Sequence, residues 1–198
     1  MTTVDIPLSA DVWMESSDPT TNKSAGTHRI RIGERNDAAE IWRTWIKPDF
    51  SSIPAGQTFI SATLNIMPQA DVSSNARTLS VARCLRAVVA AQITWNVYST
   101  GNNWGTAGGS NSSTDYDGAT LVGTGTQPAS PTLDVMLNYT LTASELQKLY
   151  DGTYTNNGLI LFVATQTDDA ILHYSTENAT PSKRPTITIT YGGGGFFF

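Results

Sequence analysis

The chain has 198 residues, which is enough for one large β domain with a sizeable hydrophobic core. Only 15% of the residues are charged, and 17 acidic side chains outnumber 12 basic ones, giving a net charge of −5. This balance argues against binding to a nucleic-acid backbone, which needs a basic patch. The polar remainder is dominated by Thr, Ser, Asn and Gly, a composition typical of β-rich proteins with many loops.

Cys84 is the one cysteine in the sequence, so no intramolecular disulfide can form, and its place in a strand pattern predicts a buried thiol. The first residues show neither the basic nor the apolar region of a secretory signal. No later run approaches the roughly 20 apolar residues that a membrane span requires. We therefore expect a chain that is made in the cytoplasm and neither spans a membrane nor carries a signal peptide.

Two strands are predicted before the first long bend, at residues 10–14 and 28–33. In the second, apolar and basic residues alternate with the period of two that places one face on a core. Ile30 and Ile32 are then expected to point inward, and Arg31 outward.

The stretch from Ile41 to Met67 predicts two strands separated by a bend. The second strand alternates apolar and polar residues, so that one of its faces should be buried. Its expected inward residues are Ile60, Ala62, Leu64 and Ile66. Between the strands, Pro48, Pro54 and Gly56 interrupt the hydrogen-bonded ladder and turn the chain.

The second half of the chain predicts further strands and one helix. The strands are expected at residues 78–86, 133–141, 159–164, 170–174 and 186–191. The run 159–164 is apolar throughout, which favours a central strand covered on both faces. Thr142 to Glu145 has the form of a capping box, which predicts a short helix that ends near Gly152. Its buried residues should be Leu146, Leu149 and Tyr150.

These elements predict an all-β domain over residues 1–191, arranged as a two-sheet, jelly-roll-like β-sandwich with one short helix. Residues 94–114 are the longest irregular segment within it. Loops of this length in a compact domain are usually functional or mobile.

The sequence also resembles a known family. Arg43-Thr-Trp-Ile-Lys-Pro-Asp-Phe-Ser-Ser-Ile-Pro-Ala-Gly, followed by Ile60-Ser-Ala-Thr-Leu-Asn-Ile, is similar to the signature of DNRLRE-type domains. Further segments agree in order: Asp11-Val-Trp with 19–22 and 31–33, Ile93-Thr-Trp-Asn with 104–109, and 174–177 with 184–191. The resemblance covers residues 9–191 and implies a jelly-roll fold that is mostly found outside cells. Some similar domains are carbohydrate-binding modules.

The last seven residues differ in composition from everything before them. Four glycines, Gly192, Gly193, Gly194 and Gly195, predict a flexible tether, and Phe196, Phe197 and Phe198 an apolar tip. An exposed apolar tip usually indicates a partner, so we expect these residues to bind another subunit. The alternatives are that the tip folds back onto its own domain or is an appended remnant.

No catalytic motif accompanies the two histidines, His28 and His173, which both fall in predicted strands. We therefore expect no enzymatic activity, and histidines that are buried or lie on the sheet. Asp115 and Asp117 are weak candidates for a structural calcium ion, because clustered carboxylates suit that cation. Aspartates are also common in turns for local backbone reasons, which is the interpretation we favour, and no other cofactor is expected.

Aromatic side chains in and just after the long irregular segment could provide flat surfaces for a sugar. The candidates are Tyr98, Trp104 and Tyr116, with Tyr98 and Trp104 expected to be exposed. Trp95 is expected instead to pack beneath the loop.

These observations lead to two expectations of function. The first is a structural virion protein of a bacteriophage, in a head-decoration, neck or tail position, anchored through its C-terminal Gly/Phe tail. Its partners would be other virion subunits or sister copies, and a symmetric homo-oligomer is expected. The second is a carbohydrate-binding module that adheres to cell-surface or environmental polysaccharide.

Overall fold

The structure is a computed structural model, and it describes residues 1–24, 29–35, 40–71, 75–164 and 170–193. The strands of this part are β1 (Thr2–Glu15), β2 (Arg29–Arg35), β3 (Glu40–Pro48), β4 (Gln57–Ile66), β5 (Pro68–Asp71), β6 (Arg77–Cys84), β7 (Val97–Ser99), β8 (Asn102–Asn103), β9 (Tyr116–Gln127), β10 (Leu137–Leu141), β11 (Leu159–Val163), β12 (Ile171–Tyr174) and β13 (Thr186–Gly193). The helices are α1 (Ala143–Tyr150) and a short 3-10 turn, η1 (Pro181–Lys183). Strands hold 51% of the residues and helices 6%, which confirms the prediction of an all-β fold.

Eight strands form a closed ring in the order β1-β13-β4-β10-β9-β6-β11-β3, because β3 pairs back with β1. The sequence predicted two separate sheets, but the hydrogen-bonded ladder runs continuously around this barrel. The ring is held unevenly. β4 and β13 share eight residue pairs from Thr186↔Asn65 to Gly193↔Gln57, whereas β9 and β10 meet at the single pair Leu141↔Gly123.

The first strand closes the ring because it serves two neighbours in turn. Its first half, from Thr2 to Pro7, pairs with β13, and its second half, from Leu8 to Glu15, pairs with β3. The register shifts between Leu8 and Ala10, where the strand changes partner. A bulge of this kind bends a strand and increases its twist, as the corner of a barrel requires.

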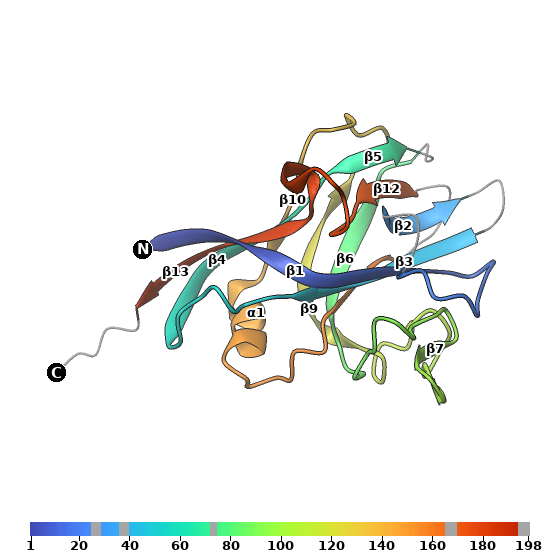
Figure 1. Ribbon diagram of the computed structural model, residues 1–198, viewed down its shortest axis with the longest axis horizontal. Helices are drawn as coiled ribbons and strands as arrows, with labels where there is room; N and C mark the ends of the chain where they lie inside the picture. Colours follow the sequence, from blue (N-terminus) through green and yellow to red (C-terminus); the bar gives the residue numbers. More distant parts are fainter. Residues whose placement is uncertain (25–28, 36–39, 72–74, 165–169, 194–198) are drawn as a thin grey trace.

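Outside the ring, β2 continues from β3 into a small antiparallel sheet with β12 and β5. Figure 1 shows β2, β5 and β12 at one end of the long axis of the molecule, and the N-terminus, the end of β13 and α1 toward the other. The two ends therefore carry different surfaces.

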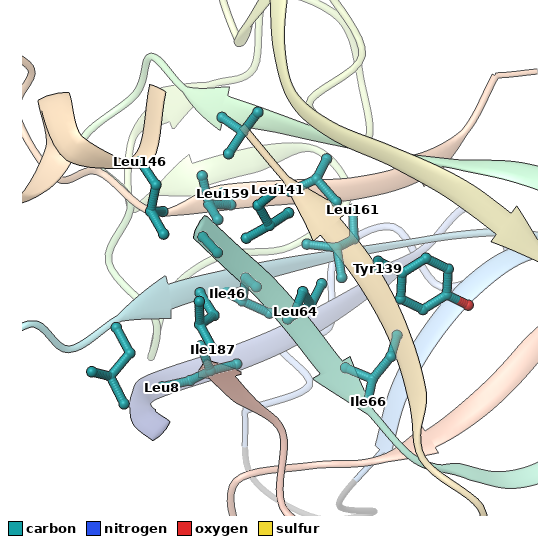
Figure 2. Packing of buried hydrophobic residues seen from close by; sticks show 14 of the residues in the cluster. Leu8, Ile46, Leu64, Ile66, Tyr139, Leu141, Leu146, Leu159, Leu161 and Ile187 are labelled. Atoms are coloured by element: carbon teal, nitrogen blue, oxygen red, sulfur yellow. The ribbon is translucent and has the colours of Figure 1, made fainter. Parts of the chain in front are cut away.

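The main hydrophobic core fills the ring. Figure 2 shows Leu64 and Ile66 of β4, Ile187 of β13 and Leu159 and Leu161 of β11 meeting there, and all five are fully buried. A second core lies on the outer face of the same wall, beneath the long segment after β6. It contains Val12, Met14, Trp45, Ala82, Cys84, Ile93, Trp104, Ile160 and Phe162.

The β11 strand confirms the prediction of a central strand covered on both faces. Leu159 and Leu161 face the inner core, while Ile160 and Phe162 face the outer one, and the strand pairs with both β3 and β6. Figure 2 shows the inward residues of this strand close to Leu141. Both faces are therefore covered, as its unbroken apolar run indicated.

The predicted helix is present as α1, but its capping differs from the expectation. Thr142 is the N-cap residue and makes no side-chain hydrogen bond, so the capping box does not form. Leu146 and Leu149 are buried as predicted, whereas Tyr150 is half-buried. Gly152 follows the helix with a positive φ of 81°, the left-handed conformation that terminates helices.

Two strand predictions need correction. A bulge opposite Thr190 and Tyr191 reverses the alternation at the start of β4, so that Phe59 is buried and Ile60 is 49% exposed. The strand expected at 133–141 begins only at Leu137, and Leu133 and Val135 are exposed.

Several smaller differences concern the number and position of strands. The twelve-residue strand β9 and the four-residue strand β5 were not predicted. The β3 and β4 strands lie on either side of the predicted bend, but each pairs with other strands. Within the described part of the chain, neither helical element has the length and apolar character of a membrane-spanning helix.

Candidate functional site

The long irregular segment is organised around one buried carboxylate, that of Asp115. Its Oδ1 accepts a hydrogen bond from the backbone N–H of Gly105 at 2.7 Å. Its Oδ2 accepts from the N–H groups of Thr106, at 3.0 Å, and Asn111, at 3.1 Å. The Nε of Arg86 lies 3.3 Å from Oδ1 and provides the balancing positive charge. The carboxylate thus holds together three points of a loop that has little regular structure of its own.

These contacts bear on whether Asp115 and Asp117 could bind a calcium ion. Both oxygens of Asp115 already face hydrogen-bond donors, which a cation would have to displace. Asp117 accepts from the backbone of Ala119 and Thr120 and forms an ion pair with Arg83 at 2.9 Å. No group of three potential metal ligands is found among the described residues. The geometry therefore favours a turn and loop-fixing role for the two aspartates.

The aromatic candidates are brought near one another, but not as an open platform. Trp104 is only 5% exposed and its Nε1 donates to the carbonyl oxygen of Thr94 at 3.0 Å, so the prediction that it is exposed is wrong. The physical reason is that the loop folds back over the outer core, and the indole fills that core. Tyr98 packs on Trp104 with ring centroids 5.5 Å apart and remains half-buried.

The other two rings of this region also lie against the protein. Tyr116 is half-buried and packs on Phe162, with 4.9 Å between ring centroids. Trp95 is half-buried and lies over Gly108, where a Cβ atom would come within 2.6 Å of the indole. Its packing within the loop is what the sequence predicted. Of the three sugar-binding candidates, Tyr98 has the surroundings that best suit a ligand, because Asn102 and Asn103 are exposed on the other strand of its hairpin.

At the opposite end of the long axis from β13, a cluster of charged residues surrounds two buried tryptophans. The guanidinium of Arg31 lies 3.8 Å from the ring centroid of Trp13 and 4.8 Å from that of Trp42. Arg31 was expected to point outward, but it is half-buried against these rings. Lys23 lies over Trp13 and forms an ion pair with Glu15 at 2.6 Å, which ties the loop after β1 to the barrel.

Within this cluster, Glu15 and Glu40 form a hydrogen-bonded carboxyl pair. Burial, together with the neighbouring Glu40, raises the pKa of Glu15 above its ordinary value. Burial also acts against ionisation of Glu40, but the hydrogen bond from Glu15 and the positive charge of Arg31 outweigh it and lower the pKa of Glu40. The pair is therefore arranged to share a proton.

Of the two histidines, only His173 lies in the described part of the chain. His28 lies outside the described residues. His173 is fully buried in β12, and burial lowers the pKa of its imidazole to about 3. It therefore stays neutral near neutral pH, in agreement with the prediction of a buried histidine.

The C-terminal strand carries the start of the predicted attachment segment. Gly192 and Gly193 belong to β13 and pair with Thr58 and Gln57 of β4. Gly194, Gly195, Phe196, Phe197 and Phe198 lie outside the described residues. The segment therefore leaves the barrel beside the first residue of β4.

A hollow near that point was not predicted from the sequence. It has a volume of about 440 Å³ and lies between the bend before β4 and the helix α1. Its lining residues are Phe50, Ile53, Ala55, Gly56, Gln57, Gln147, Tyr150 and Asp151. The rings of Phe50 and Tyr150 stand 6.0 Å apart at their centroids. The sequence does not predict this hollow, because the bend that carries Phe50 and Ile53 and the helix that carries Tyr150 are far apart in the chain and meet only in the fold.

No family model matches the chain, and no match is found among curated proteins.

Proposed function

We propose that this chain is a non-enzymatic structural protein of a bacteriophage particle, attached to other virion subunits or to sister copies through residues 192–198. The observation that supports the proposal is the position of β13. The strand has a hydrogen-bonded neighbour on each side, β1 and β4, and leads directly into the Gly/Phe segment. Assembly would take place in the host cytoplasm and end in the virion.

This position suits an attachment point for a mechanical reason. A pull on the segment is directed along β13, so it loads the hydrogen bonds to both neighbouring strands together. Six residue pairs join β13 to β1 and eight join it to β4. An edge strand would have one such ladder, and it could be peeled away one bond at a time.

The proposal includes a finer assignment of the fold to the jelly-roll-like sandwiches of the DNRLRE type. Two features of the ring support this assignment. The β9 and β10 strands are joined by one residue pair, and β1 changes partner at Leu8. These are the two places at which a ring of eight strands would divide into two facing sheets of four.

The test compares the full chain with a variant that keeps β13 intact. Replacing Phe196, Phe197 and Phe198 by serine leaves the pairing of Gly193 with Gln57 unchanged. We expect the serine variant to keep the folded barrel, as judged by its circular-dichroism spectrum, but to be lost from purified particles of the encoding phage, as measured by mass spectrometry. Light scattering tests self-association. The variant should have the mass of a monomer, close to the 21.3 kDa of the unsubstituted chain. Particles that contain both forms equally would contradict the proposal.

A second candidate is binding to a polysaccharide through Tyr98. It is favoured by the exposed residues Asn102 and Asn103, which lie on the strand paired with the one that carries the half-buried Tyr98. The experiment is retention of Tyr98→Ala on a polysaccharide column, with Tyr154→Ala as the control, because Tyr154 is equally half-buried but lies elsewhere. Loss of retention in the first variant alone would favour a sugar site, and equal retention of both would exclude Tyr98 from one.

A further inference from the structure

The hollow beside α1 lies next to the place where the Gly/Phe segment leaves the barrel. Gly193, the last described residue, pairs with Gln57, and Gln57 lines the hollow. Phe196 follows Gly193 by three residues, a reach of at most ~10 Å for an extended chain. The first phenylalanine can therefore arrive at the hollow without any movement of the barrel.

The hollow has the chemistry that an aromatic ring requires. Phe50, Ile53 and Tyr150 supply apolar surface, and its volume of about 440 Å³ lies within the ~300–1,000 Å³ of typical ligand sites. Polar side chains line it as well, namely those of Gln57, Gln147 and Asp151.

The walls of the hollow are fixed by hydrogen bonds. Gln147 accepts from the N–H of Phe59 at 2.7 Å and donates to the carbonyl oxygen of Gln57 at 3.2 Å. Tyr150 donates to the carbonyl oxygen of Pro54 and accepts from the N–H of Gln57. A ligand would thus meet a preformed site.

The glycines before the phenylalanines are suited to a change of direction. A Cβ atom at Gly193 would have no heavy atom within 4 Å, so packing does not require glycine there. What a run of glycine provides is backbone freedom, including positive φ. A chain that leaves along β13 needs this freedom to turn around the start of β4.

We propose that, in the free protein, the phenylalanine side chains of residues 196–198 occupy this hollow of their own chain. A tether this short gives its own phenylalanines a high effective concentration at the hollow, which favours them over those of another copy. Docking also removes from water an apolar patch that would otherwise promote aggregation. The inference concerns the free protein and goes beyond the proposed attachment, because the same segment would have to leave the hollow to reach a partner.

Disulfide trapping in the full chain tests the docking. One variant carries Gly195→Cys with Ala55→Cys, an exposed position that lines the hollow. The control carries Gly195→Cys with Thr2→Cys, which is also exposed and pairs with Tyr191 on the other side of β13. The native Cys84 thiol is fully buried and does not interfere. The measurement is the rate at which each pair oxidises, read on a non-reducing gel with unchanged melting temperatures as the check on folding.

We expect the Ala55 pair to close within one molecule about tenfold faster than the Thr2 pair, and this preference to vanish when the three phenylalanines are replaced by serine. Equal rates for the two pairs would overturn the proposal. Cross-linked dimers as the main product of the Ala55 pair would also overturn it, since the occupant would then be a second copy. The outcome is independent of the particle test, because docking can hold in a chain that never enters a virion, and attachment can hold without docking.

Discussion

Gly105 donates its backbone N–H to Oδ1 of Asp115 across 2.7 Å, although the two residues are ten positions apart in an irregular stretch of chain. Thr106 and Asn111 donate to the other oxygen of the same carboxylate. One fully buried side chain thus fixes the stretch between Asn103 and Tyr116, in which no residue belongs to a strand.

Substitution of this carboxylate is expected to loosen the loop. Asp115→Ala should lower the free energy of unfolding by about 3–5 kcal/mol, because three backbone N–H groups and the Arg86 guanidinium lose their acceptor. Chemical denaturation measures the change. The control is Asp117→Ala, whose partly exposed ion pair and turn contacts should cost about 1 kcal/mol or less. Equal effects of the two substitutions would show that Asp115 does not organise the loop.

Two glycines with similar backbone angles should respond differently to alanine. Gly158 has a φ of 87°, and a Cβ atom there would lie 2.5 Å from the carbonyl oxygen of Ile46 and from Nε1 of Trp45. Gly152 has a φ of 81°, but a Cβ atom would meet nothing within 4 Å. Gly152→Ala should cost about 1–2 kcal/mol from backbone strain alone, and Gly158→Ala about 3–5 kcal/mol because a steric clash adds to that strain. Thermal unfolding of both variants checks the difference, and similar melting temperatures would contradict it.

His173 should make the fold sensitive to acid. Burial lowers its pKa from 6.5 to about 3 in the folded state. The unfolded chain therefore binds a proton at this imidazole below pH 6.5, whereas the folded chain binds one only below about pH 3. Stability therefore falls as the pH drops through this window, by about 2–3 kcal/mol between pH 7 and pH 4.5.

The contribution of His173 is isolated by comparison with His173→Gln, which does not titrate. Unfolding free energies of both proteins at pH 7 and pH 4.5 give a difference of differences in which the carboxylates cancel. Identical pH dependence in the two proteins would rule out a neutral buried imidazole.

Cys84 should be chemically silent in the native protein. Its thiol is fully buried, and burial raises its pKa to about 12, so almost no thiolate is present at pH 8. A thiol reagent is expected to react with it only at the rate at which the protein opens. Reaction rates with a chromogenic disulfide, measured with and without denaturant, check this, and rapid reaction of the folded protein would contradict it.

The successful sequence predictions came from patterns that local chemistry determines. The apolar run of β11 predicted its burial on both faces, and Gly152 marked the end of α1. The missed strand β9 shows the opposite situation. It contains Gly123 and Gly125, which look like strand breakers, but a Cβ atom there would come within 2.7 Å of β10 side chains. Glycine is required at these positions because β10, which is distant in sequence, packs closely against them. Local propensity does not reveal this requirement.

The candidate site was less predictable for the same reason. Trp104 looked like an exposed ring because its neighbours are polar, yet the loop folds it into the outer core. The hollow beside α1 is lined by both Phe50 and Tyr150, which are a hundred residues apart in the chain, so no local sequence pattern predicts it. The direction of Ile60 depends on a bulge opposite Tyr191, which is again a property of the partner strand.

The pairing of β1 with β13 also sets an order of events during synthesis. Thr2 pairs with Tyr191, so the barrel stays open until nearly two hundred residues have left the ribosome. Until then, the facing edges of β1 and β4 carry unpaired backbone groups that other chains could capture. The late arrival of β13 is therefore the step at which a nascent chain either closes or aggregates.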